Sequence, residues 1–126
     1  MNILNQEPEK KKLWPVIIIG AGPVGLLLAN LLGRQNIRCL LAEKRLESAE
    51  WSKAIGVTPP SLDILEKGCL HRPVLEAGVR VKKAIVHDER GPAGSVSFEQ
   101  IESGFRFILT LPQYDTTKIL EKSLAQ

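Results

Sequence analysis

The first third of the chain contains two different apolar patterns. Residues 16–19 form a run of β-branched side chains, Val-Ile-Ile-Ile, which predicts a buried strand. A leucine-rich segment then continues to residue 32 as a helix, and Asn36 can adopt the left-handed conformation found at helix ends. Residues 38–43 return to a strand pattern. The order strand, helix, strand predicts a βαβ unit with parallel strands.

Two further helices are predicted in the second half. Thr58 precedes two prolines and an apolar face, so we expect it to cap a helix that runs to Gly68. Asp115 is expected to cap the last helix. The side chains of Ile119, Leu120 and Leu124 in this helix are expected to face the core.

An antiparallel excursion is predicted between these helices. Alternating residues predict one half-buried strand from Val79 to Asp88, with Val79, Val81 and Ile85 facing inward. Residues 91–94, Gly-Pro-Ala-Gly, are expected to form the turn, and residues 95–98 and 105–109 two further strands. A doubly wound sheet needs another parallel strand after the excursion, so the predicted fold is incomplete.

A glycine-rich sequence joins the first strand to the first helix. It follows the G-x-G-x-x-G pattern and reads Gly20-Ala21-Gly22-Pro23-Val24-Gly25. In this pattern the first glycine allows a tight turn, the second lets a pyrophosphate approach the backbone, and the third lets the helix pack closely. The N-terminus of the helix would then stabilise the phosphates with backbone amides.

Glu43 ends the second strand, 18 residues after Gly25. This is close to the spacing of roughly 20 residues at which a carboxylate binds a ribose. A carboxylate also repels a 2′-phosphate, so we expect the adenosine ribose of FAD or NAD to be preferred over that of NADP.

An alternative interpretation of the first segment is a membrane anchor, because residues 16–32 contain no charged side chain and follow three lysines. The glycines, the proline and Glu43 favour the βαβ unit, and we expect no membrane span.

Composition narrows the class of protein. With 126 residues, the chain fits a flexible leader at 1–15 and one domain at 16–126. The 17 basic and 14 acidic residues are too balanced to predict a nucleic-acid partner. Cys39 and Cys69 stand apart, which predicts a reduced, cytoplasmic protein, and His71 and His87 are interpreted as surface or loop residues rather than metal ligands. No catalytic residue is assigned, and the oligomeric state is left open.

Three segments resemble the FAD-dependent aromatic-ring hydroxylases, the single-component flavoprotein monooxygenases. They are the glycine sequence with residues 40–44, the Lys53-Ala54-Ile55-Gly56 loop with the helix after it, and Leu111-Pro112-Gln113 at the start of the last helix. The resemblance implies an α/β, Rossmann-like FAD-binding domain, made of a βαβ unit and an antiparallel strand excursion. It is incomplete, because the family's later aspartate-glycine and glycine-aspartate motifs are not found before Gln126.

The resemblance also implies a set of cofactor-binding residues. The pyrophosphate would lie at the glycine sequence, including Ala21 and Pro23, the ribose at Glu43 beside Lys44, and the ribityl or pyrophosphate region at Gln113. Lys53 would replace an arginine that touches the phosphates, and lysine lacks the forked hydrogen bonding of guanidinium. Pro60 stands where family members often have a second arginine.

Intact family members oxidise an aromatic small molecule with O2, using NADPH or NADH as electron donor. We expect weak FAD or ADP binding by this chain, and no hydroxylation by it alone. Two alternatives remain at this point: an NAD-binding module of a dehydrogenase or reductase, and a non-catalytic remnant. The excursion and Gln113 argue against the dehydrogenase, because simple nicotinamide domains proceed directly to a third parallel strand.

Overall fold

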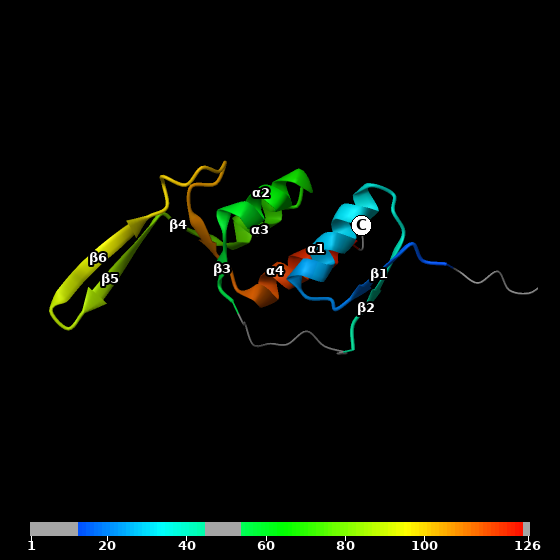
Figure 1. Ribbon diagram of the computed structural model, residues 1–126, viewed down its shortest axis with the longest axis horizontal. Coiled ribbons are helices and arrows are strands. Elements are labelled where there is room, and N and C mark those ends of the chain that lie inside the picture. Colours follow the sequence, from blue (N-terminus) through cyan, green and yellow to red (C-terminus); the bar gives the residue numbers. More distant parts are fainter. Residues whose placement is uncertain (1–12, 45–53, 125–126) are drawn as a thin grey trace, which may run out of the picture.

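The βαβ unit predicted at the start of the chain is present. The computed structural model describes residues 13–44 and 54–124. In it, β1 (Val16–Ile19) and β2 (Cys39–Ala42) pair in parallel, joined by helix α1 (Pro23–Arg34), as Figure 1 shows. Asn36 has φ 58°, which confirms the left-handed residue after the helix. The segment at 16–32 is thus divided between a strand and a helix, and none of the helices described is long and apolar enough to cross a membrane.

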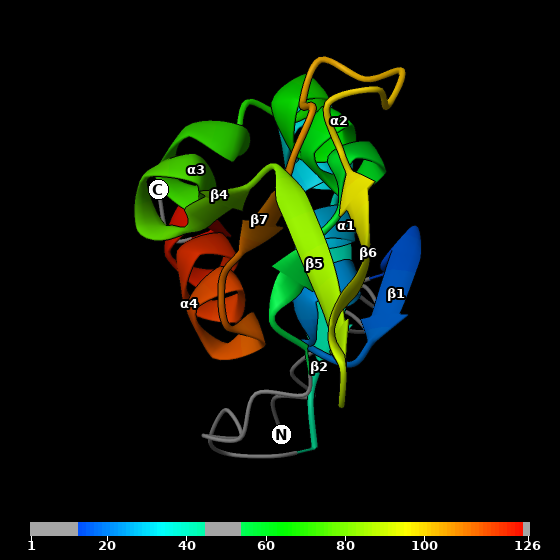
Figure 2. The same ribbon diagram turned by 90° about the vertical axis from the view of Figure 1, so that its left-hand side faces the viewer.

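The rest of the described chain forms three helices, a small antiparallel sheet and a β-hairpin. The helices are α2 (Pro59–Lys67), α3 (His71–Ala77) and α4 (Gln113–Leu124). The sheet has the order β3-β7-β4, with β3 (Gly56–Val57) and β4 (Val79–Val81) on either side of β7 (Ile108–Thr110). Helix α4 lies against α1, so the last described element returns to the βαβ unit (Figure 2).

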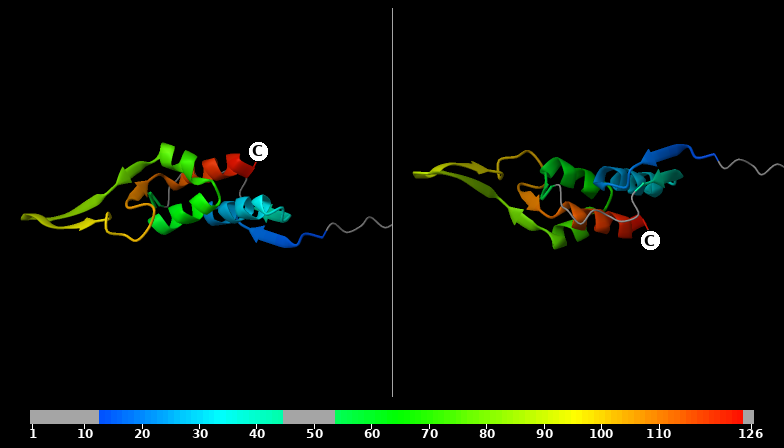
Figure 3. Two further views of the ribbon diagram at one scale, coloured as in Figure 1. Left: turned by 90° about the horizontal axis from the view of Figure 1, so that it is seen from above. Right: turned by 90° about the horizontal axis from the view of Figure 1, so that it is seen from below.

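A β-hairpin projects from one end of this body (Figures 1 and 3). It consists of β5 (Lys83–Asp88) and β6 (Gly91–Ser97). The prediction of one strand from Val79 to Asp88 is therefore wrong, because Lys82 separates β4 from β5. Val79 and Ile85, predicted to face inward, are 67% and 57% exposed.

The hairpin turn was also misplaced. Asp88 accepts a hydrogen bond from the Arg90 amide through Oδ1, at 2.7 Å, so the chain reverses at residues 89–90. Asp and Asn side chains often close turns in this way. Gly91–Gly94, predicted as the turn, instead begins β6. Pro92 is tolerated there because it lies in a two-stranded ribbon, opposite a register shift between Val86 and His87.

The helix ends differ from prediction in detail. Thr58 is the N-cap of α2, as predicted, but its hydroxyl lies 3.0 Å from the Ser61 hydroxyl and makes no side-chain bond to a backbone amide. Asp115 does not cap α4, because the helix begins two residues earlier and Thr116 donates its amide to the Pro112 carbonyl. Leu124 was predicted to face inward but is 41% exposed, whereas Leu120 is buried.

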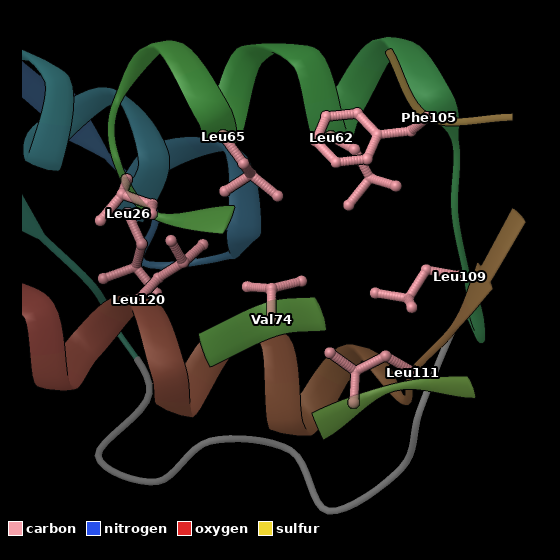
Figure 4. Packing of buried hydrophobic residues seen from close by; sticks show 9 residues of the cluster. Leu26, Leu62, Leu65, Val74, Phe105, Leu109, Leu111 and Leu120 are labelled. Carbon is pink, nitrogen blue, oxygen red and sulfur yellow. The ribbon is translucent and has the colours of Figure 1, made fainter. Parts of the chain in front are cut away.

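One hydrophobic core joins the two halves of the chain (Figure 4). Helix α1 contributes Leu26, and α4 contributes Leu120. The remaining members come from α2, α3, β7 and the residues beside them: Leu62, Leu65, Leu70, Val74, Phe105, Leu109 and Leu111. The buried Asn30 adds a polar link, because its Nδ2 donates to the carbonyls of Leu26, at 2.9 Å, and Leu120, at 3.0 Å. The core thereby fixes α4 against the helix that follows the glycine sequence.

Candidate functional site

Two glycines of the glycine-rich sequence, Gly20 in the loop after β1 and Gly25 in the first turn of α1, are required by the packing of the chain itself. Gly20 has φ +102°, a conformation that residues with a Cβ rarely adopt. A Cβ on Gly25 would collide with the carbonyl oxygen of Gly20 and lie 3.3 Å from the Ile18 side chain. The first turn of α1 therefore packs directly on the loop.

Gly22 is different, because no neighbour in the described chain requires it. Its φ is −77°, which any residue can adopt, and a Cβ there would have no heavy atom within 4 Å. The side of the loop at Gly22 is thus open space. A glycine at this point leaves the backbone accessible to a ligand, which is the role the sequence pattern predicts.

The loop also presents unused backbone donors. Gly22 is the N-cap of α1, Pro23 follows it, and the first turn contains no acidic residue. The amides of Gly22, Val24 and Gly25 have no hydrogen-bond partner within residues 13–44 and 54–124. Such donors at a helix N-terminus form a ready site for a phosphate group.

Glu43 lies at the same edge as this loop. Its Oε2 accepts a hydrogen bond from the Ala21 amide at 2.9 Å. Lys44 follows it at a bend and is exposed. The structure therefore places an acidic side chain beside the open loop, as the βαβ spacing predicted.

A pocket of about 370 Å³ lies beside the start of α1. Pro23 and Val24 line it from α1, Ala54 and Gly56 from the segment before α2, and Gln113 from the start of α4. The last two segments are joined by backbone bonds, since Leu111 donates to the Ile55 carbonyl at 2.8 Å and Gln113 to the Ala54 carbonyl at 2.9 Å. Lys53 lies outside the described residues.

The pocket thus brings together parts of all three segments on which the resemblance rests. Glu43 and Lys44 do not line it. Most of the pocket's walls are apolar. Several lining residues were not predicted as site residues: Val24, Leu27, Ala54, Gly56, Val57, Ser61, Leu65, Leu111, Thr116 and Leu120. Of these, Thr116 is the least evident from sequence, because it is a polar residue buried on a helix with a mostly polar pattern.

The histidines do not build a second site. His71 begins α3 rather than lying in a loop, and its Nδ1 is buried without a hydrogen-bond partner while its ring stacks at a tilt near Phe105. His71 therefore does not lie in a loop, and its side chain is half-buried. Within the described ranges, no three His, Cys, Asp or Glu side chains gather as metal ligands. Cys39 and Cys69 are both free thiols.

Comparison with known proteins agrees with this geometry. A family model described as "FAD binding domain" matches residues 14–126. Rifampicin monooxygenase from Streptomyces venezuelae is 33% identical over 109 residues, which are 86% of this chain and 22% of that protein. A 3-(3-hydroxy-phenyl)propionate/3-hydroxycinnamic acid hydroxylase from Comamonas testosteroni is 49% identical over 51 residues, or 40% of this chain and 9% of that protein.

A similar fold occurs in the crystal structure of p-nitrophenol 4-monooxygenase from Pseudomonas putida DLL-E4. The TM-score is 0.81 at 21% sequence identity, over 87% of this chain and 29% of that one. Of the two curated relatives named above, the chain spans less than a quarter of the length. Because the family model covers nearly all of the described residues, the chain belongs to the FAD binding domain family.

Proposed function

We propose that this chain is the ADP-binding part of the FAD domain of a flavin-dependent monooxygenase. In a longer protein, this enzyme would hydroxylate an aromatic small molecule with O2 and with NADPH or NADH as electron donor. The observation that carries the proposal is the position of Glu43, whose carboxylate lies 2.9 Å from the Ala21 amide, at the edge of a loop with open donors. This arrangement offers a diphosphate and its neighbouring ribose adjacent binding groups.

The residues present fit the ADP half of FAD. The amides of Gly22, Val24 and Gly25 would bind the diphosphate, and Gly22 leaves the space that a close approach needs. Glu43 would accept hydrogen bonds from the ribose hydroxyls. Lys44 and Lys53 would add positive charge near the phosphates, and Gln113 would contact the ribityl or pyrophosphate region from the pocket.

FAD, when bound, supplies the redox chemistry through its ring system, while the protein binds and orients it. The described residues contribute binding only, and we assign no catalytic residue among them. The aromatic substrate is inferred from the relatives, whose names include a hydroxylase of 3-(3-hydroxy-phenyl)propionate and a p-nitrophenol monooxygenase. A cytoplasmic location is also part of the proposal, and the two free cysteines support it.

The dehydrogenase alternative gains no support from the family match, which is to an FAD domain. A non-catalytic remnant is the other alternative that the sequence leaves. Ligand binding separates the two. A remnant that has lost its site would bind neither FAD nor ADP.

The experiment compares ADP with 2′,5′-ADP, which adds a phosphate on the ribose. We expect the chain to bind ADP and FAD weakly and to bind 2′,5′-ADP less well, because Glu43 would repel the extra phosphate. The Glu43→Gln variant, which removes the charge, should reduce this discrimination. Equal binding of both nucleotides by the wild-type chain would contradict the assignment of Glu43, and NADPH-dependent hydroxylation by residues 1–126 alone would contradict the expected lack of activity.

A further inference from the structure

The end of β2 holds two successive amides of the glycine loop. The Gly20 amide donates to the Ala42 carbonyl at 2.7 Å, and the Ala21 amide donates to Glu43 Oε2 at 2.9 Å. The first bond is made by backbone on both sides, so any residue at position 42 could provide it. The second depends on a side chain. Among the described residues, the Ala21–Glu43 bond is the hydrogen bond that joins loop residues 20–22 to a side chain.

We propose that Glu43 is a positioning residue, which fixes the glycine loop before any cofactor binds. This role is additional to the ribose contact in the proposed function, and it rests on that function only for the identity of the ligand. The Glu43–Ala21 bond joins two groups of this chain, so its effect on the loop can be measured without adding a nucleotide.

The loop needs such an anchor because it is short and rich in glycine. Only three residues separate the end of β1 at Ile19 from the start of α1 at Pro23, and two of them are glycines. Glycine has the largest backbone freedom to lose on ordering. The Gly22 carbonyl accepts a hydrogen bond from the Leu26 amide at 2.9 Å, but the space where a side chain at Gly22 would lie is open. Ala21, between the two glycines, is the point at which one hydrogen bond restricts both.

Fixing Ala21 also sets the direction of the donors that follow it. The amides of Gly22, Val24 and Gly25 come next in the chain, and they are the groups proposed to bind the diphosphate. A loop already ordered in the free protein loses less conformational freedom on binding than a mobile one. A carboxylate is also a stronger acceptor for a backbone amide than a neutral group. Glu43 would thus support phosphate binding without touching a phosphate.

The test measures amide hydrogen exchange by NMR in the ligand-free chain 1–126. Glu43→Gln and Glu43→Ala both remove the negative charge, but only glutamine keeps an acceptor oxygen at the same distance. We expect the Ala21 amide to exchange about tenfold faster in E43A than in E43Q, a ratio equal to about 1.4 kcal/mol. The Gly20 amide should exchange equally in both variants, because its partner is the Ala42 carbonyl. Lys44→Ala is the matched control and should leave Ala21 unchanged.

Two results would overturn the inference. One is an equal Ala21 exchange rate in E43A and E43Q, with the Leu109 amide protected in both as evidence that they are folded. The other is an acceleration in E43A that spreads equally to Gly20 and Leu109, which would indicate general destabilisation. Because no nucleotide is present, neither result depends on whether the chain binds FAD, and a failure to bind ADP would count only against the proposed function.

Discussion

Gly25→Ala tests the close packing of α1 on the glycine loop. The added Cβ would overlap the Gly20 carbonyl oxygen and lie 3.2 Å from the Gly20 carbonyl carbon, so the clash is with backbone and no side-chain rotation relieves it. Overpacking of this kind typically costs about 1–3 kcal/mol. We expect the free energy of unfolding to fall by about that amount and ADP binding to be lost with the loop geometry.

Gly33→Ala is the matched control, since Gly33 lies in the same helix. A Cβ at Gly33 would meet no atom within 4 Å, and alanine favours helix over glycine by roughly 0.5–1 kcal/mol. This variant should therefore be slightly more stable than the wild type. Urea unfolding followed by circular dichroism gives both free energies. If G25A proved as stable as G33A, the close approach of helix and loop would be refuted.

Two further substitutions test the contacts that hold α4 in place. Asn30→Ala removes the donor to the Leu120 carbonyl and should lower the free energy of unfolding by about 1–3 kcal/mol, as expected for a buried group left without its partner; a change below about 0.5 kcal/mol in urea unfolding would contradict the link. Leu109→Ala should cost about 2–5 kcal/mol, because Leu109 is fully buried and fills the space beside Gly78. A thermal midpoint unchanged by L109A would show that this part of the core is not packed as described.

The βαβ unit could be predicted because its signals are local. The β-branched run, the glycine pattern and the left-handed Asn36 each act within a few residues, and the structure confirms the strand, the turn and the left-handed residue. The prediction that the strand is buried is wrong, because Ile17 and Ile19 are 58% and 84% exposed. The position of Glu43 beside the loop followed from the parallel pairing of the two strands, since strands in register end at the same edge.

The second half was harder because its elements depend on distant partners. Strand β3 has two residues and exists through its pairing with β7, more than fifty residues later, so it has no local pattern. Helix α3 was not predicted, although Pro73 in its first turn was an available signal. The single strand expected from Val79 to Asp88 divides because β4 pairs with β7 while β5 pairs with β6. Alternation alone cannot show to which sheet each part belongs.

The pocket could not be predicted as a cavity, only as three separate motifs. Its walls come from segments far apart in sequence, and backbone bonds from Leu111 and Gln113 to residues 54–55 bring them together. These bonds carry no side-chain signature. The family resemblance indicated the three segments, and the structure shows that they contact one another.

The most direct test of the account is an NMR titration of the chain with ADP, following each backbone amide. We predict that the largest shifts occur at Gly22, Val24 and Gly25, whose amides are open donors at the start of α1, and that the shifts saturate together. Binding without change at these three amides, or no binding of ADP at any concentration up to several millimolar, would contradict the claim that this loop binds the diphosphate.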